Sequence, residues 1–267
     1  KHRHCWTKIH KRKSFCCKQK SFGIQRCCFE IFAAVKNTWN ILEQKFDFVF
    51  FTGSQSVGKE VLRHTAENLT PTILELGGKS PCIVDESAKI PLAAKRIVFG
   101  KYLNCGQTCV APDYILCHKN VKEEFVNEVK KQIENQYGKN PLENSDYGKI
   151  INQKHFERIL SLINPKKIVY GGKSNSQNQQ IEPTVLDNVT WDDEVMQEEI
   201  FGPIMPIITF ENLDEVISTL QKKQKPLALY IFSQNKNNIK AITEKVSYGG
   251  GCINDTIIHL ATSEMGF

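Results

Sequence analysis

The feature that most constrains the fold is an alternation of strand-like and helix-like segments that begins near Phe29. Short apolar runs predict strands at 46–51, 72–76, 82–84, 114–118, 167–170, 184–186, 204–210 and 227–232. Apolar residues at helical spacing predict helices at 57–69, 90–103, 121–137, 152–163, 213–221 and 237–246, and the polar stretch 171–180 predicts a loop. Such alternation is typical of an α/β fold with a largely parallel sheet, which is the fold class that we expect.

The positive charge of the chain is confined to its first residues. The formal net charge is +6, but residues 1–26 hold nine of the 35 Lys and Arg residues and no acid. The remaining 26 basic and 29 acidic residues give residues 27–267 a net charge of −3. We therefore expect no nucleic acid to bind the main body of the protein.

Residues 1–27 are basic and cysteine-rich and show neither helical nor strand periodicity. We therefore expect them to form a disordered extension. An arm that binds nucleic acid is the sharper alternative. A zinc site is another, built from Cys16, Cys17, Cys27 and Cys28 with His4 or His10, although no Cys-x-x-Cys spacing supports it. We expect no metal.

The sequence shows no recognisable targeting signal. No apolar segment of signal-peptide length follows the basic N-terminus, and no run of about 18 apolar residues occurs. The ten cysteines are accordingly expected to be thiols. A cytoplasmic location follows as a prediction, with a membrane anchor beyond Phe267 left open.

The stretch GSQSVGK at 53–59 lies between a predicted buried strand and a predicted helix. Backbone N–H groups and the helix dipole at such a junction can hold a phosphate. The stretch nearly matches the Walker A motif of nucleotide hydrolases, but Glu60 replaces the hydroxyl residue that binds Mg²⁺. A plain glycine turn and a dinucleotide site are the remaining alternatives.

The segment NCGQTC at 104–109 contains the strongest candidate nucleophile. Gly106 allows a substrate to approach the backbone, and a thiolate at Cys109 would be the reactive form. Structural burial and metal ligation are the alternatives. Gly106 and Gln107 oppose a regular helix that presents both cysteines, so Cys105 is expected to pack inward.

Two acidic segments complete the set of candidates. Glu75 lies in LELGGKSP, where a carboxylate at the end of an apolar strand is costly unless it is paired or functional, for instance as a general base. The segment EEIFGP at 198–203 puts Glu199 two residues before Phe201, an arrangement suited to ribose hydroxyls and a flat ring. A backbone-bonded Glu75, a solvated acid and a core Phe are the plain alternatives.

Together the four segments resemble the aldehyde dehydrogenase superfamily. The order FTGSxxVGK, LELGGKSP, NCGQTC, EEIFGP carries the resemblance over residues 28–267, and FDFVFFTGS and APDYILC are most similar to its class 3 branch, which includes fatty aldehyde dehydrogenases. The resemblance implies NAD- or NADP-dependent oxidation of an aldehyde to a carboxylate. It implies medium- or long-chain aliphatic or aromatic aldehydes as substrates and a homodimer as the assembly.

The resemblance also implies a role for each matching residue. Cys109 corresponds to the nucleophile, whose backbone N–H contributes to the oxyanion hole, and Glu75 corresponds to the base that activates the hydrolytic water. The residues that correspond to the coenzyme site are Gly53, Ser54, Gly58, Leu76, Gly77, Glu199 and Phe201.

The implied organisation is the end of a Rossmann-like coenzyme domain followed by an α/β catalytic domain. Residues 28–75 correspond to the C-terminal remnant of the coenzyme domain, and residues 76–267 to a catalytic domain truncated at its C-terminal end. The family's Pro-Trp-Asn and Lys-Pro-Ser motifs do not occur in this sequence. The alternative expectation is therefore an inactive fragment or pseudoenzyme of the same family that acts as a binding partner.

Overall fold

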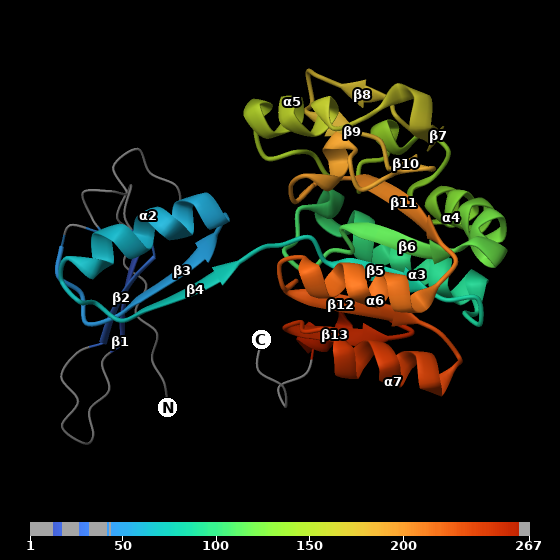
Figure 1. Cartoon of the computed structure of the whole chain (residues 1–267). Coiled ribbons are helices and arrows are strands. Elements are labelled where there is room, and N and C mark those ends of the chain that lie inside the picture. The colour runs from blue at the N-terminus through green and yellow to red at the C-terminus, as the bar shows by residue number, and fades with distance from the viewer. Residues whose placement is uncertain (1–12, 18–26, 32–41, 43, 262–267) are drawn as a thin grey trace. The chain divides into compact units, whose positions relative to one another are not determined.

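A computed structural model describes residues 13–17, 27–31, 42 and 44–261 (Figure 1). The chain divides into two compact units, Lys1–Glu75 and Leu76–Phe267, which are described separately below.

The first unit contains two small sheets. Strands β1 (Lys13–Cys17) and β2 (Cys27–Ile31) pair antiparallel, with Cys16 opposite Cys28 and Cys17 opposite Cys27 in the register. The sequence predicted no strand there. His4, His10 and the rest of the predicted 1–27 extension lie outside the described residues.

Strands β3 (Val49–Gly53) and β4 (Thr72–Leu76) form the second sheet, and helix α2 (Gln55–Ala66) connects them and packs against β3. The predicted burial of the 46–51 strand is wrong, because Phe48 and Phe50 are 49% and 62% exposed. Successive side chains of a strand point to opposite faces, and α2 covers only one of them.

The second unit is built on a seven-stranded sheet in the order β13-β12-β5-β6-β11-β10-β7 (Figure 1). The strands are β5 (Pro81–Val84), β6 (Tyr114–His118), β7 (Ile168–Tyr170), β10 (Thr184–Leu186), β11 (Ile204–Phe210), β12 (Ala228–Phe232) and β13 (Gly250–Ile253). Every pairing is parallel except that of β7 with β10. These pairings confirm the predicted α/β class with a largely parallel sheet.

Helices cover both faces of this sheet and create two cores. Helices α3 (Ile90–Tyr102) and α4 (Lys122–Tyr137) pack on the side chains of Cys82, Ile115 and Tyr230. Helices α5 (Gln153–Ser161), α6 (Leu213–Lys222) and α7 (Lys236–Lys245) share the other core with Leu116 and Ile231. Burial on both faces explains why these strands are continuous apolar runs.

Asparagine side chains set the starts of the three helices on the second face. An Oδ1 atom accepts a hydrogen bond from a first-turn N–H of α5, α6 and α7, and the residues concerned are Asn152, Asn212 and Asn235. This bond satisfies a backbone donor that has no partner within the helix. The predicted starts of these helices lie within one residue of the observed ones.

One prediction in the second unit is wrong, and one strand was not predicted. The predicted loop 171–180 contains a short antiparallel hairpin of β8 (Ser174–Asn175) and β9 (Gln180–Ile181). Strand β13 was not predicted, because its two glycines have low strand propensity. Tertiary packing requires them: a Cβ at Gly251 would lie 2.0 Å from the Leu229 carbonyl oxygen.

The topology brings the chemically interesting loops to one edge of the sheet. The segments that hold Lys79, Cys109 and Glu199 run directly into the amino ends of β5, β6 and β11, respectively. These three strands are neighbours in the sheet and parallel, so their amino ends lie together. Among the helices of the described residues, none is long and apolar enough to cross a membrane.

The central strand should dominate the stability of the second unit. Ile115 of β6 is fully buried, whereas Ile151 is 73% exposed. We expect Ile115→Ala to lower the free energy of unfolding by about 2–5 kcal/mol, because it removes buried methyl groups and leaves a cavity. The matched variant Ile151→Ala should change it by less than about 0.5 kcal/mol. Urea unfolding followed by circular dichroism measures both, and equal effects would contradict the burial of β6.

Candidate functional site

The loop that carries Cys109 has an unusual backbone. Helix α3 ends at Tyr102, and the 3₁₀ turn η1 (Leu103–Gly106) follows it. Asn104, Cys105 and Gly106 have φ values of 51°, 55° and 74°, so three successive residues adopt the left-handed conformation. Only glycine adopts this conformation at little cost, and strained backbone of this kind clusters at functional sites.

Side-chain hydrogen bonds of Gln107 hold the loop in this conformation. Its Nε2 atom donates to the carbonyl oxygens of Asn104 (3.1 Å) and Lys149 (3.0 Å). Its Oε1 atom accepts from the N–H of Ile151 at 3.0 Å. The loop is therefore fixed to the segment before α5.

The two cysteines of the loop have different surroundings. Cys105 is 2% exposed, which confirms the prediction that it packs inward, and burial raises its pKa to about 11. Cys109 is half-buried and packs against the core on the α3 and α4 face. The next residue, Val110, accepts a hydrogen bond from the Tyr230 hydroxyl at 2.6 Å. Cys109 is thus the more exposed of the two cysteines of this loop.

Glycines bring the Cys109 loop and the EEIFGP segment into contact. A Cβ on Gly106 would lie 2.3 Å from the carbonyl oxygen of Gly202, so no other residue fits there without a shift. Gly77 plays the corresponding part for Glu199, because a Cβ on Gly77 would lie 2.3 Å from the Glu199 Oε2 atom. The second unit therefore places Gly77 against Glu199, and the turn that precedes Cys109 against Gly202, the residue after Phe201.

The Glu199 carboxyl lies in an environment that disfavours its charge. Burial, followed by the negative charge of Asp113, raises its pKa to about 7. A hydrogen bond from the Gly78 N–H and the positive charges of Lys79 and Arg158 oppose this shift. Glu199 is therefore a carboxyl group that titrates near neutral pH.

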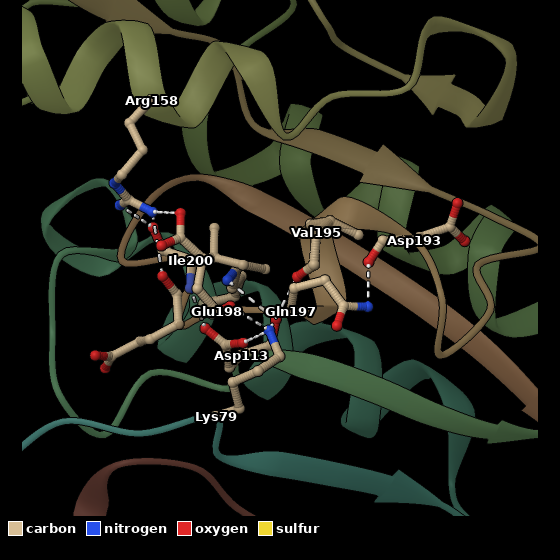
Figure 2. A network of polar contacts seen from close by, with 10 residues as sticks. Lys79, Asp113, Arg158, Asp193, Val195, Gln197, Glu198 and Ile200 are labelled. Atoms are coloured by element: carbon tan, nitrogen blue, oxygen red, sulfur yellow. Dashed lines mark hydrogen bonds and ion pairs between the residues drawn. The ribbon is translucent and has the colours of Figure 1, made fainter. Parts of the chain in front are cut away.

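A polar network fixes the segment around Glu199 (Figure 2). The Lys79 ammonium forms an ion pair with Asp113 and donates to the carbonyl oxygens of Val195 (2.9 Å) and Glu198 (2.8 Å). The Asp113 Oδ1 atom accepts from the N–H of Ile200 at 3.0 Å. The segment is thus attached to both of the neighbouring loops at the edge of the sheet.

Arg158 of α5 approaches the same segment with its guanidinium (Figure 2). It donates to the Glu198 carboxylate at 2.8 Å and to the carbonyl oxygens of Glu199 (3.3 Å) and Ile200 (2.6 Å). Next to it, Phe201 has a φ of 48° and is 39% exposed, so its ring remains available to a ligand.

Sequence reasoning missed the residues that build this network. Lys79 was quoted within a motif without a role, and Asp113, Arg158 and Lys101 were not singled out. Lys101 is 1% exposed, and burial lowers its pKa to about 8 while Asp113 counteracts the shift. A lysine within an apolar helix and an aspartate just before an apolar strand were the signals available.

The remaining predicted residues belong to the first unit, except Leu76, which begins the second. Gly53 ends β3, and the Ser54 hydroxyl caps α2 by accepting from the N–H of Val57 at 3.4 Å. Gly58 is buried in α2, and Glu75 is half-buried in β4. Leu76 is the last residue of β4 and the first of the second unit. The proximity of Glu75 to Cys109 stays a prediction, because the two belong to different units.

The pKa of Glu199 generates a prediction about stability. Its carboxyl retains a proton up to about pH 7 in the folded chain, against 4.5 as the ordinary value. Between these values the folded state binds more protons, so stability due to this group falls as pH rises. We expect Glu199→Gln to gain stability relative to wild type from pH 5 to pH 8, and exposed Glu211→Gln to show no such trend. Urea unfolding at several pH values measures this, and parallel profiles for all three proteins would contradict it.

Comparison with known proteins identifies relatives over most of the chain. The aldehyde dehydrogenase family model matches residues 40–267. The 4,4'-diaponeurosporen-aldehyde dehydrogenase of Staphylococcus aureus is 49% identical over 235 residues, which are 87% of this chain and 51% of the relative. Two mammalian relatives are each 46% identical over 87% of this chain. They are aldehyde dehydrogenase family 3 member A2 of Pongo abelii, covered to 48%, and the dimeric NADP-preferring aldehyde dehydrogenase of Mus musculus, covered to 51%.

A solved structure agrees with these relatives. The substrate-bound state of Staphylococcus aureus AldH superposes with a TM-score of 0.85 at 48% identity, over 87% of this chain and 51% of that one. The chain spans about half the length of the relatives it matches. The family match and the identities over most of the chain lead to one conclusion: this protein belongs to the aldehyde dehydrogenase family, whose members are oxidoreductases.

Proposed function

We propose that this protein takes part in the oxidation of an aldehyde to a carboxylate with NAD or NADP as the hydride acceptor. The observation that carries the proposal is the half-buried Cys109 on a loop with strained backbone, which contacts the segment of Glu199 through Gly106. Cysteine is the strongest nucleophile among the side chains of this site, and an aldehyde carbonyl is an electrophile that it attacks readily.

In each unit taken by itself, the residues fit one part of a dinucleotide. Helix α2 has twelve residues, a Ser54 cap and no acid in its first turn, so its N-terminal N–H groups can receive a phosphate. In the second unit the Gly77 backbone leaves room for the Glu199 carboxylate, which can accept hydrogen bonds from ribose hydroxyls. We propose that the coenzyme is held by Gly53, Ser54, Gly58, Leu76, Gly77, Glu199 and Phe201. When bound, it supplies the acceptor for the hydride.

Cys109 would carry the first half of the reaction. Its thiolate adds to the carbonyl carbon, which forms a C–S bond and puts negative charge on the aldehyde oxygen. We propose that the Cys109 N–H stabilises this oxyanion. Loss of hydride from the same carbon restores the C=O bond and leaves a thioester on Cys109, oxidised by two electrons relative to the aldehyde.

Glu75 would carry the second half. As a general base, its carboxylate takes a proton from a water molecule, and the resulting hydroxide adds to the thioester carbon. The C–S bond then breaks, the Cys109 thiolate leaves, and the carboxylic acid that forms releases its proton to solvent to give the carboxylate product. Glu75 returns the proton to solvent, so water supplies the second oxygen of the product.

The substrate class and assembly follow the class 3 resemblance. We propose a medium- or long-chain aliphatic or aromatic aldehyde and a homodimer. The name of the Staphylococcus aureus relative specifies 4,4'-diaponeurosporen-aldehyde, and that of the mouse relative a dimer. The competing proposal is a non-catalytic family member that acts as a binding partner. It retains the fold of the second unit but predicts no turnover.

Substitution of the proposed nucleophile tests the function. We expect Cys109→Ser to lower turnover of a medium-chain aldehyde by at least about a thousandfold, because a serine hydroxyl without a base is a far weaker nucleophile. Cys117→Ala, at a thiol buried in β6, should retain turnover. Absorbance of the reduced coenzyme measures both, with NAD and NADP in turn. Unchanged activity of Cys109→Ser would remove Cys109 from the mechanism, and inactivity of the unaltered chain would favour the binding-partner proposal.

A further inference from the structure

Asp113 connects all three loops at the functional edge of the sheet. It lies four residues after Cys109, and its N–H donates to the Ser80 carbonyl oxygen at 2.8 Å. Its carboxylate pairs with Lys79 of the LELGGKSP segment and accepts from the Ile200 N–H of the EEIFGP segment. The residue is 4% exposed, so these bonds form away from water, where they are strong and costly to lose.

The same bonds restrain Glu199 on both sides. The Ile200 N–H belongs to the peptide that follows Glu199, and Asp113 holds it. The Glu198 carbonyl belongs to the peptide that precedes Glu199, and Lys79 holds it at 2.8 Å while paired to Asp113. Two adjacent peptide planes are therefore tied to one ion pair, which leaves little freedom at the Glu199 Cα atom.

We propose that Asp113 is a positioning residue that holds the Glu199 carboxylate in register with Cys109. This proposal rests on the proposed function, in which Glu199 binds the coenzyme ribose and Cys109 is the nucleophile. Asp113 touches neither substrate nor coenzyme. It acts through the Ile200 peptide and through Lys79, and its own backbone lies on the segment that carries Cys109.

The charge of Asp113 gives this role a signature that packing alone would not give. The charged groups around the Glu199 carboxylate come from four elements: Lys79 before β5, Lys101 in α3, Asp113 before β6 and Arg158 in α5. Asp113 raises the pKa of Glu199, whereas Lys79 and Arg158 lower it. Removal of Asp113 and removal of Arg158 should therefore move the titration of Glu199 in opposite directions.

The test is a carboxyl titration of the whole chain without coenzyme or aldehyde. Carbon-13 labelling of glutamate side chains allows Glu199 to be followed by NMR, and its signal is identified by its loss in Glu199→Gln. The variants are Asp113→Asn, which keeps the shape and removes the charge, and Arg158→Gln. The matched control is Asp187→Asn, which removes the charge of a half-buried aspartate that is also paired with a lysine, Lys122.

We expect the Glu199 midpoint to fall below about 7 in Asp113→Asn, to rise in Arg158→Gln and to stay constant in Asp187→Asn. A mere loosening of the segment toward water would lower the midpoint in both site variants. A midpoint that does not fall in Asp113→Asn, or a fall in both site variants, would overturn the proposal. Because this readout needs no turnover, it stands apart from success or failure of the proposed reaction.

A kinetic readout applies if the unaltered chain turns over. Asp113→Asn should raise KM for the coenzyme by about tenfold or more, because a buried charge-assisted contact is lost, and should leave KM for the aldehyde within about threefold. An equal rise in both constants would contradict a role specific to Glu199.

Folding of the variants is measured by thermal melting. If Asp113→Asn does not fold, Asp113→Ser provides the same loss of charge and keeps an acceptor for the Ile200 N–H. Failure of both to fold, with Asp187→Asn folded, would reduce Asp113 to a structural residue and overturn the proposal.

Discussion

The ion pair between half-buried Lys79 and buried Asp113 is the interaction on which the rest of the site depends. A charge removed from water, such as that of Asp113, must be paired and hydrogen-bonded, since an unpaired buried charge costs several kcal/mol. Lys79 donates hydrogen bonds to the carbonyl oxygens of Val195 and Glu198, and Asp113 accepts one from the N–H of Ile200. One electrostatic requirement thus fixes three loops that are far apart in the sequence. The sheet makes it possible, because the three loops enter neighbouring parallel strands at the same edge.

Within that frame, glycine and strain shape the surface offered to a ligand. Gly106 lets the Cys109 loop lie directly on Gly202, and Gly77 leaves room for the Glu199 carboxylate. The residues before Gln107 have a left-handed backbone, and three hydrogen bonds of the Gln107 side chain hold the loop in this conformation. The half-buried Cys109 and a carboxyl whose pKa is raised to about 7 then lie on loops at one edge of the second unit. The proposed dehydrogenase chemistry requires both groups to be held rigidly, because misplacement of reacting groups by about 1 Å is costly.

The sequence predicted the elements better than the contacts between them. Strands buried on both faces are continuous apolar runs, so 114–118 and 204–210 were placed to the residue. Strand β13 and the 174–181 hairpin were missed, since glycine and polar residues carry no periodic signal. Cys109 and Glu199 were proposed as site residues because motif and residue type coincide. Asp113 was not, because its role comes from partners at sequence distances of 34 and 87 residues, which no local pattern encodes.

The central claim is that Cys109 becomes covalently acylated during aldehyde oxidation. The most direct measurement uses Glu75→Gln, in which hydrolysis of the thioester should be slow. The variant is mixed with coenzyme and a medium-chain aldehyde, quenched in acid and digested, and the acylated peptide is located by mass spectrometry. We predict one acyl group per chain, attached to Cys109 and removable by hydroxylamine. Coenzyme reduction with the acyl group on Cys105 or Cys252, or with no acyl group at all, would contradict the account.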